Sequence, residues 1–291
     1  MKAIRCCLLL AASGYAMWVG SHLRIGNPVE GSNMLWPDSE FNVGVRAVNA
    51  HFPGSNTVEV VLEAKSRALD HRIATQPDAV ATRTKLQRML EADAVSPPRA
   101  TLSFTDYISE TTRLISGGNP KWTQLDYMTP EQVHAAAFAA QLGTNTLNFG
   151  NVADFEFQHS TVSAWYKNNM QDTVDAALAA ANRAADAVGR DHPEFEVKVA
   201  TGVIALQQAM NNVVERYHTI IIVMVNLAVM VLAMWAYRSV VAAIILLIPV
   251  NLSNFYLIAA MQMLGVGLDV NAGIVAVMGV GVGIDYGIYL L

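Results

Sequence analysis

The sequence is poor in cysteine, and its two cysteines, Cys6 and Cys7, are adjacent near the amino terminus. No disulfide framework can therefore hold the middle of the chain together. Basic residues are in the minority, because 19 lysines and arginines face 24 aspartates and glutamates, for a net charge of -5 at pH 7. Without a basic stripe to neutralise phosphates, no nucleic-acid partner is expected. The seven histidines show no ligand spacing, so we expect neither a metal site nor a cofactor.

Charge is nearly absent from the last quarter of the chain. Between residues 220 and 291 the charged residues are Arg238, Asp269 and Asp285. The whole sequence is 53% hydrophobic with a mean hydropathy of +0.31, and the apolar residues gather at its two ends. Such a long run with so little charge is typical of several membrane-spanning helices. The sequence indicates an α+β membrane protein, with transmembrane α-helices flanking a soluble middle region.

The apolar ends predict up to four membrane spans. Residues 1–21, an apolar run behind Lys2 and Arg5, are interpreted as the first transmembrane helix, with a secretory signal peptide as the alternative. Residues 219–291 would hold transmembrane helices two to four, at 219–236, 239–264 and 272–291. Lys2, Arg5 and Arg238 then fall on one side, which the positive-inside rule assigns to the cytoplasm. Residues 22–218 would therefore lie outside the cytoplasm.

This middle region mixes the periodicities of helix and strand. Helices are predicted at 39–51, 79–91 and 170–188, and strands at 57–63, 161–166 and 194–200. Asp38 is the expected N-cap of the first helix. The strand–helix pair and the later strand–helix–strand unit suggest two small βαβ sandwiches. Turn signals separate these halves, and no regular structure is predicted from 97 to 154. Residues 203–218 are expected to form a helix that runs directly into the second span.

Asp285 is the most informative single residue, because it lies deep in the last apolar run. A carboxylate at the bilayer centre costs about 2.5 kcal/mol or more on insertion scales. A chain that keeps one there usually uses it in a proton or ion path. Tyr286 lies about 100° around the helix from Asp285 and could share its hydrogen-bond network.

Glycines surround this acid at helical spacing. Gly279, Gly283 and Gly287 recur every fourth residue and would give one smooth face for close approach of another helix. Gly281 lies on a second stripe with Asp285. The simpler interpretation is a packing helix whose aspartate only bonds a neighbour, but packing alone does not require an acid.

These residues carry a resemblance to a known family. The run Gly283-Ile284-Asp285-Tyr286-Gly287 resembles the fourth transmembrane helix of the resistance-nodulation-division (RND) exporters, in the branch with the MMPL-type membrane domain. Residues 25–28 and 35–42 resemble the loop after the first span of one half of such a transporter. The order of one span, a large outer loop and a cluster of spans is similar as well.

The resemblance implies a proton-driven exporter of hydrophobic or amphiphilic substrates, lipid or drug-like, in the bacterial inner membrane. It makes Asp285 and Tyr286 the proton relay and residues 22–218 an extracytoplasmic porter-like α/β domain. Because such exporters have two halves of six spans, the chain is expected to be a fragment, the product of a split gene or the product of an interrupted reading frame. Its partners would then be membrane lipid, the remaining spans, a hydrophobic substrate and further copies in an oligomer.

Two other functions share features with this sequence. A protein-export or membrane-assembly accessory would share the same proton-coupled fold, and the sequence does not separate it from a lipid or drug exporter. An intramembrane aspartyl protease would need two aspartates that share a water. Asp269 and Asp285 are sixteen residues apart, about 24 Å along a helix, and Gly283-Ile284 departs from the protease pattern. We therefore do not expect an enzyme.

Overall fold

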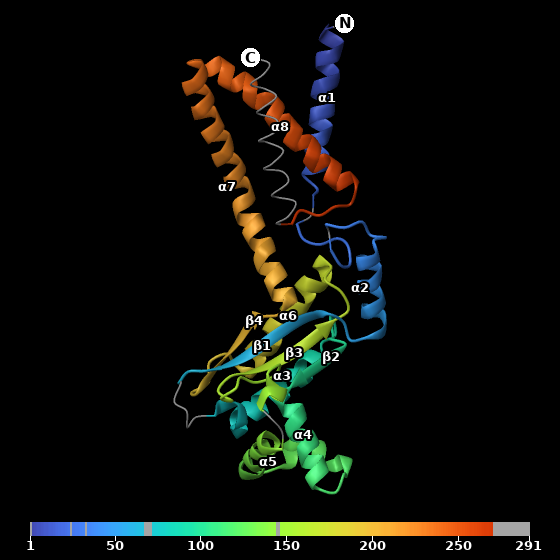
Figure 1. The fold of residues 1–291 in the computed structure, drawn as a ribbon, viewed down its shortest axis with the longest axis vertical. Coiled ribbons are helices and arrows are strands. Elements are labelled where there is room, and N and C mark those ends of the chain that lie inside the picture. Colours follow the sequence, from blue (N-terminus) through green and yellow to red (C-terminus); the bar gives the residue numbers. More distant parts are fainter. Residues whose placement is uncertain (1, 24, 33, 67–71, 144–145, 270–291) are drawn as a thin grey trace. The chain divides into compact units, whose positions relative to one another are not determined.

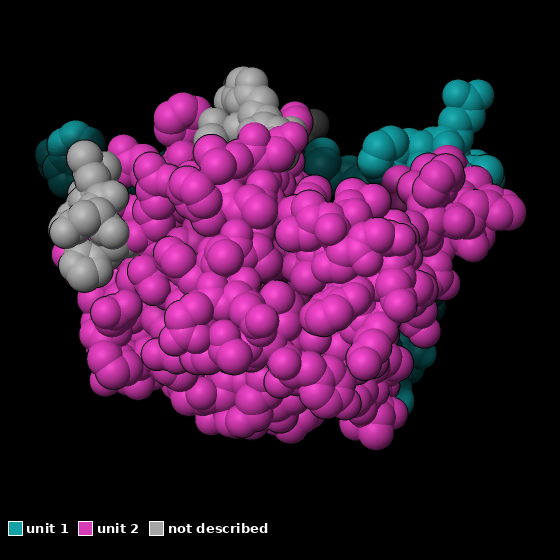
Figure 2. All heavy atoms as spheres, turned by 90° about the horizontal axis from the view of Figure 1, so that it is seen from below, with its two compact units in different colours: residues 1–43, 207–291 teal, residues 44–206 magenta. Residues whose placement is uncertain are grey.

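The computed structural model describes residues 2–23, 25–32, 34–66, 72–143 and 146–269. The chain divides into two compact units, which Figure 2 colours separately. The helical unit comprises residues 1–43 and 207–291, and the sheet unit comprises residues 44–206. Figure 1 labels the helices and strands of both.

The sheet unit is built on one four-stranded antiparallel sheet. Its strands are β1 (Asn56–Ala64), β2 (Ala100–Ser103), β3 (Ser160–Tyr166) and β4 (Phe195–Thr201), in the order β2-β3-β1-β4. In the register of the sheet, Val60 of β1 lies opposite Val162 of β3 on one side and Val199 of β4 on the other. Helices α3 (Pro77–Glu91) and α6 (Gln171–Val188) pack on the sheet.

The predicted strands and the two helices that cover the sheet are confirmed, but the expectation of two sandwiches is wrong. β1 and β2 do not pair with each other, because β3 lies between them. In the same way, β1 lies between β3 and β4. The two split βαβ units therefore interleave in a single sheet, the ferredoxin-like arrangement. Interleaving gives both central strands two partners, so fewer backbone groups are left at sheet edges.

Side chains along the strands alternate between a face that helices cover and a face that they leave open. Along β1, buried residues alternate with half-buried ones from Asn56 to Ala64. The covered face holds Val58, Val60 and Leu62, each at most 1% exposed, against Ala177 and other small residues of α6. Each fully buried aliphatic side chain contributes roughly 1.5–3 kcal/mol relative to exposure.

A helical subdomain follows β2, where no regular structure was predicted. Helices α4 (Phe104–Ile115) and α5 (Pro130–Leu142) begin with capping boxes at Ser103 and Thr129. Short 3₁₀ helices η1 (Ile73–Thr75), η2 (Pro120–Thr123), η3 (Leu125–Tyr127) and η4 (Thr146–Phe149) surround them. Phe104, Phe149 and Phe157, all at most 1% exposed, form the centre of this second core with ring centroids 5.1 to 5.7 Å apart.

Helix α2 (Glu40–His51) starts one residue later than predicted. The expected N-cap, Asp38, is wrong: Ser39 holds that position, and its hydroxyl accepts a hydrogen bond from the Asn42 amide at 3.3 Å. A cap must directly precede the first helical residue to reach the free amides of the first turn, and only Ser39 does so here.

In the part of the helical unit that the structure describes there are three long helices: α1 (Lys2–Gly20), α7 (Val203–Tyr237) and α8 (Val240–Met263). The prediction of one continuous helix from residue 203 into the apolar run is confirmed, because α7 is unbroken over 35 residues, about 52 Å at 1.5 Å per residue. Its first turn lies in the sheet unit. A tight turn follows, with Arg238 at a φ of 49° and Ser239 capping α8 through the Ala242 amide.

Within the described part of the chain, α7 and α8 are the two helices long and apolar enough to cross a membrane. This agrees with the expected membrane protein. Helix α1 is present over the predicted first span, but its role as a span remains a prediction.

Candidate functional sites

The predicted proton relay lies outside the described residues. Asp285, Tyr286 and all four packing glycines, Gly279, Gly281, Gly283 and Gly287, belong to the segment 270–291. Their roles therefore remain predictions. Asp269, the other acid of the apolar part, is described and follows Leu268, which forms an isolated bridge with Ile25. Asp269 is therefore outside α8, in the segment that follows it.

The apolar helices α7 and α8 carry amide side chains that the sequence analysis did not single out. Asn251 of α8 donates to the Asn226 side-chain carbonyl of α7 at 2.8 Å. Each of the two also donates to the backbone of its own helix, at Leu247 and Ile222 respectively. Asn254 is only 7% exposed, and its amide nitrogen has no hydrogen-bond partner within the described residues. Such polar pairs hold membrane helices together by about 0.6 kcal/mol on average.

Helix α1 packs closely on α8. The Ser13 hydroxyl lies 3.1 Å from the Tyr256 hydroxyl, and Ala16, Val19 and Ala259 form a small buried cluster. Gly20 makes this approach possible, because a Cβ there would lie 2.9 Å from Ile258 Cγ2. Small residues at such a contact are typical of membrane helix pairs.

The segment between α1 and α2 is organised by Asn42, which is fully buried. Its side-chain oxygen accepts from the Ser32 amide at 2.8 Å. Its amide donates to the carbonyls of Ser32, Leu35 and Trp36, at 3.0 to 3.3 Å. The side chain of Asn42 thus fixes the loop before α2, whose sequence resembles the loop after the first span of RND exporters. The sequence offered no signal for this role beyond the presence of a polar residue early in a helix.

Two serines of β3 are buried, one on each face of the sheet. Ser160 and Ser163 of β3 are 1% and 3% exposed. The Ser160 hydroxyl accepts a hydrogen bond from Arg83 Nη1 at 2.8 Å. Arg83 is fully buried, and it also donates to the Ala74 carbonyl at 2.7 Å and to Thr105 at 3.3 Å. Burial lowers the pKa of Arg83 to about 9, so its guanidinium stays charged at neutral pH.

A cavity of about 350 Å³ opens in front of β3, and we call it the β3 cavity. Its lining residues include Glu59 on β1, Ser163 and Trp165 on β3, and Asp154 and His159 on the preceding loop. The Asp154 carboxylate accepts from the His159 amide at 2.7 Å, and His159 Nδ1 accepts from the Ala64 amide at 3.1 Å. These bonds tie the loop to the edge of the sheet.

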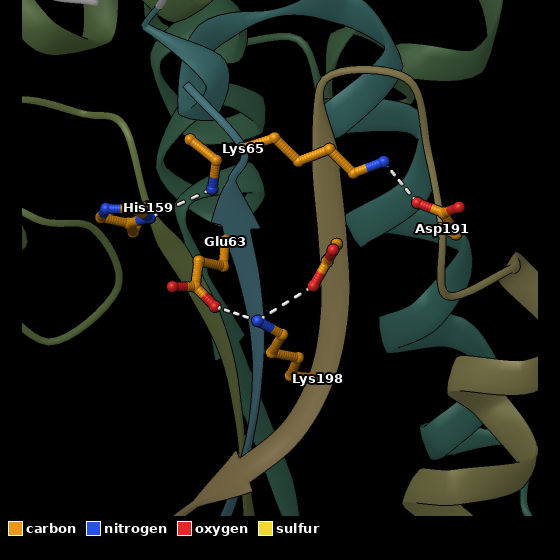
Figure 3. A network of polar contacts seen from close by, with 7 residues as sticks. Glu63, Lys65, His159, Asp191 and Lys198 are labelled. Atoms are coloured by element: carbon orange, nitrogen blue, oxygen red, sulfur yellow. Dashed lines mark hydrogen bonds and ion pairs between the residues drawn. The ribbon is translucent and has the colours of Figure 1, made fainter. Parts of the chain in front are cut away.

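Beyond this cavity, the same face of the sheet carries a network of ion pairs. Lys198 on β4 bonds Glu63 at 2.5 Å and Glu196 at 2.9 Å, and Figure 3 shows the contact with Glu63. The hydrogen bonds that Lys198 donates to these two carboxylates raise its pKa. Lys65 pairs with Asp191 beside it. Among the described residues, no group of three or more His, Cys, Asp and Glu side chains could hold a metal ion.

A sequence model of the MMPL family matches residues 33–291, nearly the whole chain. The search of curated proteins found no match. The matched range contains α7, α8, the sheet unit and the predicted relay residues.

Proposed function

This chain belongs to the MMPL family, whose members are transporters of the RND type, and from that premise we propose that it works in a proton-driven exporter. Its cargo would be hydrophobic or amphiphilic. Asp285 and Tyr286 would form the proton relay, and the sheet unit would face the outside of the bacterial inner membrane. The observation that carries this proposal is the family match, because it runs through both relay residues.

The described helices support a membrane mechanism. Among the residues that the structure describes, the most apolar parts of α7 and α8 have only 6% and 22% of their residues buried. Their remaining surface is available to lipid and to further spans, which we propose belong to the complete transporter. Amide side chains in such helices mark polar contacts inside the membrane, where each must find a partner.

The proposed cycle rests on the cost of a buried charge. Protonation of Asp285 removes its negative charge and with it the desolvation penalty, so helix packing can switch between two arrangements. Each proton that moves down the membrane potential supplies roughly 2.3 kcal/mol per 100 mV, which is similar to that penalty. Because α7 is unbroken between the two units, it is the element through which we propose that the motion travels.

The relay is tested by Asp285→Asn in the complete transporter. The amide keeps the shape and most hydrogen bonds of the acid but cannot cycle a charge, so we expect normal insertion and abundance with proton-dependent export abolished. Tyr286→Phe should reduce export less, because it removes one hydroxyl.

Asp269→Asn is the matched control, because it neutralises the other acid of residues 220–291 at a position outside α8. It should leave export close to the level of the unaltered transporter. Export at the normal rate by the Asp285→Asn variant would show that the relay assignment is wrong.

A further inference from the structure

We propose that the β3 cavity binds the head group of an organic cation, a substituted ammonium that lies between the Glu59 carboxylate and the Trp165 ring. The identification of this cation as the exported substrate rests on the proposed function. The binding itself does not depend on proton coupling and can be measured separately.

The cavity has walls that are held in place before any ligand arrives. Thr161 of β3 bonds the preceding loop twice, from its amide to the Val152 carbonyl at 2.9 Å and from its hydroxyl to the Asn151 carbonyl at 3.2 Å. The Asp154 amide donates to the His159 carbonyl at 3.1 Å. The cavity volume of about 350 Å³ is at the small end of the range for ligand pockets, roughly 300 to 1,000 Å³.

Glu59 supplies a carboxylate without a protein partner. Within the described part of the chain, its side chain forms no ion pair or hydrogen bond, and it is half-buried at the cavity wall. Across the strands it lies opposite Ser163 of β3. Lys198, a cation on the same face, is already held by Glu63 and Glu196. The cavity therefore keeps a negative charge that a ligand can neutralise.

Trp165 supplies the second element of recognition. It lines the cavity and lies opposite Thr57, one alternate position along β1 from Glu59, so the ring and the carboxylate are diagonal neighbours on one face. A cation over an indole ring gains about 0.5 to 2 kcal/mol, depending on how far it is desolvated. An acid beside an aromatic ring is suited to an alkylated ammonium, which is attracted to both.

Two further features of the cavity restrict the chemical class of ligand that it can bind. Ser163 is only 3% exposed, and its hydroxyl forms no hydrogen bond within the described residues although it lines the cavity. It can contact a polar head group that enters. Asp154 adds a second carboxylate to the lining, so an anionic ligand would meet two like charges.

The test uses the purified full chain in a non-ionic detergent at about 0.15 M salt, where distant charges are screened. Three probes with one aromatic ring are titrated by calorimetry: benzyltrimethylammonium, benzyl alcohol and benzenesulfonate. We expect measurable binding of the cation and none of the other two. Glu59→Gln and Trp165→Leu should each weaken binding of the cation by about tenfold.

Glu63→Gln is the matched control, because it removes an acid from the same strand and face but outside the cavity lining. It should change cation affinity by less than about threefold. Trp165→Phe keeps an aromatic face and should retain most of the affinity, which separates ring loss from misfolding. Equal binding of all three probes, or cation binding that Glu59→Gln leaves unchanged, would overturn the proposal.

The two proposals fail in different experiments. If the unaltered chain binds the cation and Asp285→Asn leaves export unaffected, the relay assignment is wrong and the binding site is supported. If Asp285→Asn abolishes export but the unaltered chain binds no cation, the proposed binding site is wrong and the relay assignment is supported.

Discussion

Arg83 is the largest fully buried side chain described in this protein. It lies on α3 with its guanidinium 5.7 Å from the centroid of the Phe104 ring. Its bonds reach Ser160 of the sheet and Thr105 at the start of α4. One cation therefore joins the core under the sheet to the core of the helical subdomain. Within the described residues no carboxylate pairs with it directly, so the charge of its guanidinium is stabilised by neutral acceptors, by the Phe104 ring and, at longer range, by Asp106.

Replacement of Arg83 by alanine should destabilise the protein by about 3 kcal/mol or more, because it leaves a void and removes the donor that satisfies the Ala74 carbonyl. The measurement is the thermal unfolding midpoint of the purified chain in detergent. Arg88→Ala, on the same helix, is the control. Arg88 is 55% exposed and pairs with Asp126 at the surface, so its loss should cost less than about 1 kcal/mol. Equal shifts for the two variants would contradict the role of Arg83.

At the scale of elements, Gly202 determines how β4 is joined to α7. Thr201 ends the strand and Val203 begins the helix, so a single residue makes the turn. Its φ is +103°, and a Cβ at this position would lie 2.4 Å from the Thr57 carbonyl oxygen. Only glycine accepts both constraints without strain. The junction is important because α7 is the element that continues into the apolar run.

Gly202→Ala should therefore destabilise the protein by roughly 2 kcal/mol or more, through both backbone strain and the clash with β1. Gly44→Ala is a matched change inside α2, where an added Cβ would meet nothing within 4 Å. It should be neutral or stabilise by up to about 1 kcal/mol. Thermal unfolding of both variants decides the point, and a Gly202→Ala protein as stable as Gly44→Ala would refute it.

For the whole molecule, the central question is which side of the membrane each part faces. The turn at Arg238 joins the two helices that are apolar enough to span, and Asn119 lies exposed in the helical subdomain of the sheet unit. The positive-inside rule predicts that Arg238 is cytoplasmic and that residues 22–218 are outside.

Single cysteines at Asn119 and at Arg238, in a background without Cys6 and Cys7, should report this arrangement in intact cells. An impermeant thiol reagent should label the cysteine at 119 and spare the one at 238. Both should react after the cells are permeabilised, which controls for burial. Labelling at both positions, or only at 238, in intact cells would reject the predicted topology.

The sequence alone determined the features that depend on local pattern. The scarcity of charge after residue 220 predicted the long apolar helices, and a lone Arg238 between apolar runs predicted the turn that joins α7 to α8. Alternation in β1 and the alanine-rich pattern of α6 were equally clear, because each repeat reports which side of one element is buried. The family was also recognisable, since the motif around Asp285 is contiguous in the chain.

Only the tertiary structure decided which strands are neighbours, which polar residues are buried and where a cavity forms. The β2-β3-β1-β4 order depends on pairing between segments roughly 60 residues or more apart, and periodicity within one strand carries no record of its partner. Arg83 looks like any surface arginine of a polar helix until α4 and β3 close over it. Likewise, Glu59 and Trp165 meet only because β1 and β3 pair in this register. These features are non-local, so the fold had to bring their residues together before their chemistry could be recognised.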